Sequence, residues 1–281
     1  MKPAPALEMY ASLWSLRGYP TRAREWSWAR KFAAIAAAGF DGVYGPPVRE
    51  LAGRGPLRYR AVASVRQRAE AGAIFAAAAD LGAESIDLQL GTPESSLDAA
   101  VALAREARQQ AERHRLPFAV ETHRGTATET QAKTAALRTA YRRSTGERLP
   151  LCLDPSHHAL VGHAAAPLWP ALSRPAWLWR EAQRFHLRPC NGHHAQLPAR
   201  TAAGRRTPEY RDWLEYVGAL FAAIARRPQP TVVVIEIGHD RPAYRLSGFP
   251  DTWGEVRTVA GDVKRLWPVG RKSEGSGHAR R

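Results

Sequence analysis

Residues 231–237 read TVVVIEI, a stretch that combines a strand pattern with a single carboxylate. β-Branched residues fill six of its seven positions, which is typical of a β-strand. Side chains alternate between the two faces of a strand, so Val233, Ile235 and Ile237 share one face and Glu236 lies on the other. An acidic residue opposite such an apolar face calls for a functional or an electrostatic explanation.

Seven other segments have the same strand character, and helical stretches separate them. They are Leu7–Leu13, Gly42–Tyr44, Tyr59–Ser64, Ser85–Leu90, Phe118–Thr122, Leu149–Asp154 and Arg184–Arg188. Eight strand-then-helix units in roughly 270 residues predict an α/β protein with a (β/α)8 TIM barrel in a single domain. A doubly wound open sheet is the alternative, but no glycine-rich phosphate turn follows the first strand.

Helix-end signals support this division of the chain. Ser95 or Ser96 can cap one helix, and Thr207 followed by Pro208 can begin another. Three prolines in residues 164–182 limit that part of the chain to short helical pieces. No linker rich in Pro, Gly or Ser interrupts the pattern before residue 269. We therefore predict a barrel over residues 1–269 and a basic, flexible tail over residues 270–281.

The composition indicates a folded chain with a strong positive charge. The 281 residues include 41 basic and 26 acidic ones, for a formal charge of +15, and only five of the basic residues are lysine. A hydrophobic fraction of 44% with nine tryptophans excludes disorder. Two cysteines are too few for a disulfide framework, and the apolar runs are too short to span a bilayer. Without a recognisable signal peptide, we expect a cytoplasmic protein that does not enter the membrane.

Four of the predicted strands carry an inward-facing ionisable residue at or near their carboxyl end. Alternate residues of a barrel strand point inward, and those at the carboxyl end line the active site. By this parity the inward residues are Glu121, Asp154, His186 and Glu236. Each residue alone is explained equally well by a neighbouring arginine or backbone group. Four at matching strand ends favour a shared site.

Three carboxylates in one pocket repel one another and are costly to desolvate. A divalent cation resolves the conflict, and three oxygen donors with one imidazole suit Mn²⁺, Mg²⁺, Co²⁺ or Zn²⁺. We therefore expect one divalent metal ion as the cofactor.

Four longer stretches resemble a known family. They are AVETHRGTATET at 119–130, LPLCLDPSHH at 149–158, FHLRPCNGHHAQLP at 185–198 and VVIEIGHDRPAYRLSG at 233–248. Together they resemble the xylose-isomerase-like TIM-barrel superfamily, particularly its bacterial sugar phosphate isomerase/epimerase members. The resemblance spans nearly the whole chain. One departure is Tyr44, which ends the second strand where many relatives carry a glutamate.

The resemblance implies roles for particular residues. The metal ligands of that superfamily correspond to Glu121, Asp154, His186 and Glu236. In its epimerase members, the residues that correspond to the two glutamates also exchange a proton with the carbon beside the substrate carbonyl. His157 corresponds to a residue that contacts substrate hydroxyl groups.

Five further residues are candidates for binding the substrate. Arg188 and Gln196 are placed there by the resemblance. Gln89 turns inward near the end of its predicted strand, and His123 flanks the pocket, although each is explained equally well by a supporting hydrogen bond. His194 lies on the loop after the seventh strand, where histidines are often merely solvated.

The resulting hypothesis is a metal-dependent isomerase or epimerase that acts on a keto-sugar or polyol-derived substrate through an enediolate. One alternative is an endonuclease-IV-like AP endonuclease. The charge of +15 favours a nucleic-acid partner without requiring it, but the early strands lack the histidines that a three-zinc site needs. Another is a non-catalytic metal- or sugar-binding barrel of a biosynthetic pathway. Trp169, Trp177 and Trp179 fit helix packing and leave a homo-oligomer interface open.

Overall fold

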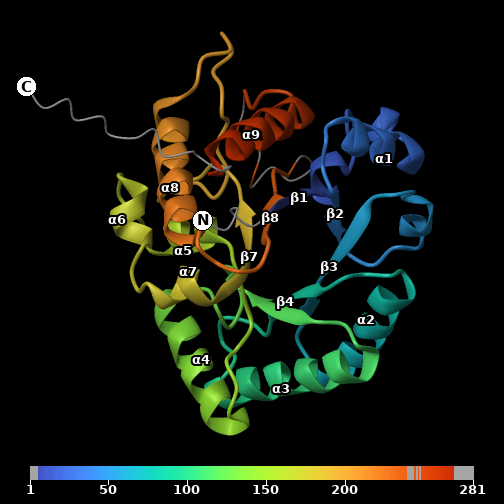
Figure 1. Ribbon diagram of the computed structural model, residues 1–281, viewed down its shortest axis with the longest axis vertical. Coiled ribbons are helices and arrows are strands. Elements are labelled where there is room, and N and C mark those ends of the chain that lie inside the picture. The colour runs from blue at the N-terminus through green and yellow to red at the C-terminus, as the bar shows by residue number, and fades with distance from the viewer. Residues whose placement is uncertain (1–5, 239–243, 245, 247, 269–281) are drawn as a thin grey trace, which may run out of the picture.

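Eight parallel strands pair in sequence order and close into a barrel, with β8 hydrogen-bonded to β1 (Figure 1). The strands are β1 Leu7–Ser12, β2 Gly42–Gly45, β3 Arg58–Val65, β4 Ile86–Leu90, β5 Phe118–Glu121, β6 Leu151–Leu153, β7 Ala182–Leu187 and β8 Thr231–Ile235. The computed structural model describes residues 6–238, 244, 246 and 248–268. The predicted single-domain TIM barrel is confirmed, whereas the predicted tail at 270–281 lies outside the described residues.

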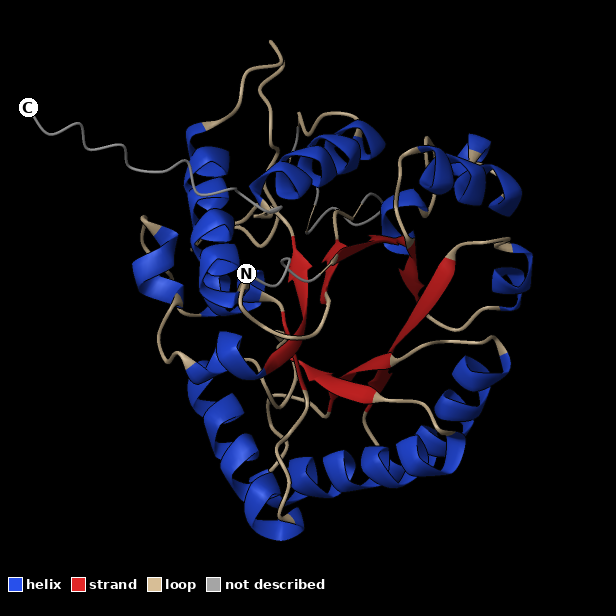
Figure 2. Ribbon diagram, viewed as in Figure 1, coloured by secondary structure: helices blue, strands red, loops and turns tan. Residues whose placement is uncertain are grey.

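Helices surround the barrel on all sides in Figure 2. The α-helices are α1 Trp28–Ala37, α2 Arg68–Asp80, α3 Leu97–His114, α4 Gln131–Thr145, α5 Pro155–Val161, α6 Leu168–Leu172, α7 Trp177–Glu181, α8 Pro208–Ile224 and α9 Thr252–Leu266; the 3₁₀ helices are η1 Leu13–Leu16, η2 Arg22–Arg24 and η3 Arg49–Gly53. Within the described part of the chain, none of these helices is both long enough and apolar enough to cross a membrane.

The connection from β2 to β3 differs from the predicted strand-then-helix pattern. It contains the 3₁₀ helix η3 rather than an α-helix. Two prolines, Pro46 and Pro47, follow β2, and the whole connection covers only residues 46–57. Proline cannot donate a backbone hydrogen bond, and so short a crossover leaves little room for an α-helix.

The predicted helix ends are observed where the sequence offered clear signals. The Ser96 side chain caps α3 by accepting from the Ala99 N–H, and Thr207 caps α8 by accepting from the Tyr210 N–H. Residues 164–182 form only the short helices α6 and α7, as their prolines predicted.

Five strands, β1, β5, β6, β7 and β8, end one or two residues earlier than predicted, and an acidic residue follows the ends of β6 and β8. β6 stops at Leu153 because Pro155 has no N–H to donate to a strand, so Asp154 becomes the N-cap of α5. β8 stops at Ile235, one residue before Glu236. Both carboxylates therefore lie at the carboxyl-end rim of the barrel.

The barrel interior is unusually polar. The main apolar core lies between the strands and the helices, whereas the apolar group inside the barrel is small and centres on Tyr10, Tyr44, Val232 and Val234. The rest of the interior must satisfy buried polar groups by pairing them.

A substitution at Gly42 would test how tightly this interior is packed. A Cβ atom there would lie 2.4 Å from the Arg58 carbonyl oxygen and 2.6 Å from Cε1 of Tyr10. We expect Gly42→Ala to lower the free energy of unfolding in urea by about 1–3 kcal/mol, because overpacking forces the backbone or the ring to move. Gly53→Ala is the control, since its Cβ meets nothing within 4 Å. Equal stability of the two variants would contradict the packing described.

Candidate active site

Four residues predicted from strand parity converge at the carboxyl end of the barrel. The ligating atoms of Glu121, Asp154, His186 and Glu236 all lie within 4.8 Å of one another. His186 Nδ1 lies 3.2 Å from Glu121 Oε1 and 3.4 Å from Glu236 Oε2. The first three side chains are fully buried, while Glu236 keeps 15% of its side-chain surface exposed. These distances allow one ion to contact all four groups.

Arg188 supplies one positive charge to this cluster. Its Nη2 lies 2.5 Å from Asp154 Oδ2 and 3.7 Å from Glu236 Oε2, and its Nε donates to Ser156 Oγ at 2.8 Å. An imidazole that binds a metal ion is neutral, so with His186 as a ligand three carboxylates and one guanidinium retain two negative charges, which one divalent cation balances. Among the described atoms, Glu236 Oε2 has no hydrogen-bond partner. The donor set and its charge therefore fit a divalent metal ion.

Burial and Arg188 together decide the ionisation of the site. Burial alone would raise the pKa of Glu236, but Arg188 and His186 lower that pKa to about 2, so the carboxylate is ionised. Burial lowers the pKa of His157 well below its ordinary value, and Arg188 lowers it further, so the ring is neutral. His157 Nε2 accepts from Arg188, which assigns the ring proton to Nδ1. In the described structure Nδ1 is buried without a partner.

Asp87 lies directly beneath His186 and was not singled out from the sequence. Its Oδ1 accepts from Arg184 Nε at 2.7 Å, and its Oδ2 lies 3.4 Å from His186 Nε2. Because Nε2 faces Asp87, Nδ1 faces the carboxylates above. The alternation that turns Gln89 inward also turns Asp87 inward, so strand parity contained the signal.

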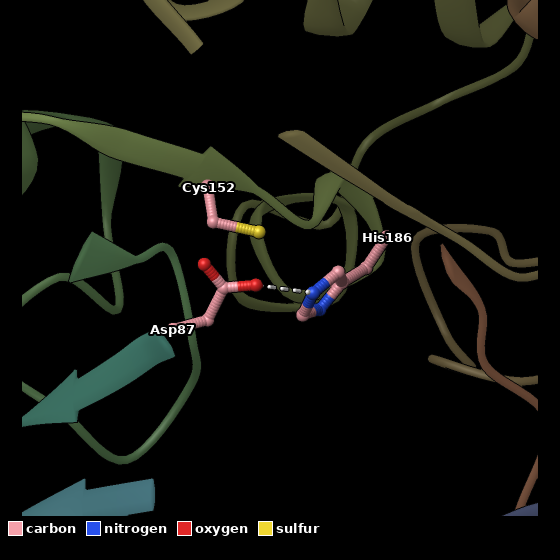
Figure 3. Close-up of side chains that lie close together, drawn as sticks. All are labelled: Asp87, Cys152 and His186. Atoms are coloured by element: carbon pink, nitrogen blue, oxygen red, sulfur yellow. Dashed lines mark hydrogen bonds and ion pairs between the residues drawn. The ribbon is translucent and has the colours of Figure 1, made fainter. Parts of the chain in front are cut away.

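Figure 3 shows Asp87, Cys152 and His186 converging in this lower layer. Arg184 already neutralises Asp87, since burial raises the pKa of that carboxyl but Arg184 and His186 bring it below its ordinary value. Burial also raises the pKa of Cys152, which keeps it a neutral thiol. This layer therefore has its charges paired without a second metal ion and supports the imidazole above.

The remaining predicted residues divide into two groups. Gln89 donates to Glu121 Oε2 at 3.0 Å and accepts from Ser64 Oγ, so it orients a candidate ligand while lining the cavity. His123 also lines the cavity, with its ring 3.9 Å from the His157 ring.

The other two lie away from the cluster of ligating groups. Gln196 uses its amide on the backbone: Oε1 accepts from the Gly238 N–H, and Nε2 donates to the carbonyl oxygens of Gly238 and Tyr244. It therefore holds Gly238 and Tyr244 through their backbone groups. His194 is exposed, and its hydrogen bonds in the described structure are backbone ones: its N–H donates to Asn191 Oδ1, and its carbonyl oxygen accepts from the Asn191 N–H.

A cavity of about 560 Å³ lies over the cluster of ligating groups, which is within the usual size range of small-molecule sites. It is lined by Trp14, Arg17, Pro46, Val62, Ala63, Ser64, Arg66, Gln89, Gly91, His123, Arg124, Gly125, Thr126, Arg188, Glu236 and Tyr244. Tyr44 contacts the His186 ring from below, at 4.7 Å between ring centroids. A larger surface cavity of about 720 Å³ beside α9 has no histidine or cysteine in its described lining, so it lacks this chemistry.

The pair formed by Asp87 and Arg184 can be tested through stability. Asp87→Asn should lower the free energy of unfolding by about 3–5 kcal/mol, because it leaves the Arg184 guanidinium buried without its counter-charge. The measurement is urea denaturation followed by circular dichroism. Asp80→Asn at the exposed end of α2 removes the same charge and should change stability little. Similar losses in the two variants would argue against a supporting role for Asp87.

No protein-family model and no curated protein matches the chain. Solved structures do match it over nearly their whole length. A probable 3-DHS dehydratase from Bacillus anthracis is 15% identical, with 92% of this chain and 98% of that chain covered and a TM-score of 0.56. An L-ribulose 3-epimerase is 13% identical, with 93% and 95% covered and a TM-score of 0.62.

A xylose isomerase domain containing protein from Salmonella typhimurium LT2 is 11% identical, with 94% and 98% covered and a TM-score of 0.61. At such low identity the similarity concerns the fold. The chain has the fold of the xylose-isomerase-like TIM-barrel proteins, as its sequence resemblance predicted.

Proposed function

We propose that the protein is a metal-dependent isomerase or epimerase of a keto-sugar or polyol-derived substrate. The observation that carries the proposal is the convergence of Glu121, Asp154, His186 and Glu236 beneath an open cavity. Structures named as L-ribulose 3-epimerase and D-psicose 3-epimerase share the fold, which supports this choice among the activities a TIM barrel can host.

The two glutamates would move the proton. Glu236 lines the cavity and is ionised, so it is the better placed to take the proton from the carbon beside the carbonyl. Glu121 is fully buried and held by Gln89, which suits it to return a proton from a fixed position. A bound divalent ion would supply electrostatic stabilisation of the enediolate charge. The reaction moves one proton off carbon and one back, so it needs no redox partner.

Two other side chains would position the substrate. Neutral His157, whose Nδ1–H is buried without a partner in the described structure, would donate to a hydroxyl oxygen that enters beside the His123 ring. Arg188 is held by Asp154 and Ser156, so its guanidinium is already oriented before substrate arrives. His123 packs against His157 and limits the space beside it.

The proposal is tested by hydrogen exchange. The protein loaded with Mn²⁺ should incorporate deuterium from D₂O beside the carbonyl of at least one ketose in a panel, read by mass spectrometry. Glu236→Gln should slow the exchange by about 10²–10⁴-fold, because the glutamine cannot accept the proton. Glu215→Gln, exposed on α8, is the control and should exchange normally.

The metal content of the same preparations separates the alternatives. Glu236→Gln should bind Mn²⁺ more weakly in titration calorimetry than the parent protein and the Glu215→Gln control, because it loses a charged ligand. Unchanged exchange by Glu236→Gln would sink the assignment of the base. Tight metal binding with no exchange on any ketose would favour the non-catalytic barrel, and metal-dependent cleavage of DNA at an abasic site would favour the endonuclease.

A further inference from the structure

Four arginines line the cavity over the cluster of ligating groups: Arg17, Arg66, Arg124 and Arg188. We propose that the substrate carries an anionic group, a carboxylate or a phosphate ester, bound by Arg66 and Arg124 at the outer part of this cavity. The inference rests on the proposed function for the reacting end of the molecule, which would lie toward Glu236. It adds a substrate class that the proposed function leaves open.

The described lining of the cavity carries more positive than negative charge. Among its described lining residues, Glu236 is the one carboxylate facing four guanidinium groups. Arg188 belongs to the cluster below, where its charge is balanced by Asp154 and Glu236. With a divalent ion added, that cluster becomes neutral. Arg66 and Arg124 then face no carboxylate partner among the described residues of the cavity.

The three outer arginines come from separate parts of the barrel rim. Arg17 follows η1 after β1, Arg66 directly follows β3, and Arg124 lies three residues beyond the end of β5. Loops at the carboxyl ends of the strands form the substrate site in this fold. Arg66 and Arg124 bring like charges from two such loops to one cavity, which costs Coulomb energy that a bound anion would offset.

Nearby carboxylates account for little of this charge. Arg66 lowers the pKa of Glu70, but that carboxylate accepts from the backbone N–H groups of Arg66 and Gln67 at the start of α2. Glu70 does not line the cavity. Across the described residues, the side chains of Arg66 and Arg124 form no ion pair shorter than 4.0 Å.

Aromatic rings orient two of the guanidinium groups. Arg124 lies over the Tyr244 ring at 4.4 Å, and Arg188 lies 5.4 Å from the same ring and 5.8 Å from Trp14. A guanidinium that stacks through its flat face keeps its N–H edge open for two parallel hydrogen bonds to a carboxylate or phosphate. The contact with Tyr244 therefore holds the Arg124 guanidinium beside the cavity, within reach of an anion bound there.

Binding of a matched set of sugars tests the inference without relying on turnover. The probes are D-fructose, D-fructose 6-phosphate and D-fructuronate, with inorganic phosphate as a minimal anion, titrated into the Mn²⁺-loaded protein at low salt. Quenching of tryptophan fluorescence is a suitable signal because Trp14 lines the cavity. At least one sugar anion should bind about tenfold more tightly than D-fructose, as charge-assisted hydrogen bonds predict. Whichever sugar anion binds more tightly identifies the group as phosphate or carboxylate.

Substitutions of single arginines would show where the anionic group of the sugar binds. Arg66→Gln and Arg124→Gln should each weaken binding of the anion about tenfold and leave D-fructose unchanged. Arg211→Gln, exposed on α8, removes the same charge elsewhere and should leave both affinities unchanged. Arg66 is exposed and Arg124 half-buried, so neither change should prevent folding, which a thermal melt would verify.

The inference is wrong if no sugar anion binds more tightly than D-fructose, or if Arg211→Gln weakens it as much as the cavity variants do. It is also wrong if the cavity variants lose affinity for abasic duplex DNA while their affinity for small anions is unchanged. Anion binding without deuterium exchange would contradict the proposed isomerase activity but support the anion site. Deuterium exchange without tighter binding of any sugar anion would support the isomerase activity and contradict the anion site.

Discussion

Neutralising three carboxylates at one end of the barrel is the constraint on which the site depends. Glu121, Asp154 and Glu236 are brought together at the carboxyl ends of β5, β6 and β8, and their repulsion is met in part by Arg188, which lies within hydrogen-bond reach of Asp154. One guanidinium is insufficient, so the residual charge selects for a divalent cation. The same constraint keeps Glu236 ionised and His157 neutral, the two protonation states that proton transfer and hydroxyl binding require.

Supporting pairs below and beside the cluster make this arrangement rigid. Asp87 and Arg184 form a buried ion pair, and Asp87 in turn orients the imidazole ring of His186. Gln89 orients Glu121 by a hydrogen bond to its carboxylate. Gln196 ties down the backbone just beyond β8. Hydrogen bonds of this kind orient ligating groups before any ion binds. They also explain the polar barrel interior, because each charge requires a partner in the same enclosed space.

The cavity over the site and the cluster of ligating groups below it carry opposite charges. This separation of charge affects which substrate the site can bind. The floor is acidic and suits a cation, whereas the outer wall holds arginines from three loops. The net charge of the chain therefore does not by itself indicate nucleic acid, since part of it is concentrated at a small-molecule cavity.

Local sequence patterns were enough to predict the barrel, the order of its strands and the inward orientation of the acidic residues. A period of two assigned Glu121, His186 and Glu236 to the interior, because side-chain alternation is a property of the strand alone. The same rule could have identified Asp87, but its importance comes from Arg184, which lies 97 residues away in sequence. The ends of the elements were harder to predict from the sequence. Prolines at 46 and 47 follow β2 at the start of its short connection to β3, and the proline at 155 ends β6 early. Closure of the barrel alone decided that Arg17, Arg66 and Arg124 share one cavity, since loop side chains follow no period that a sequence records.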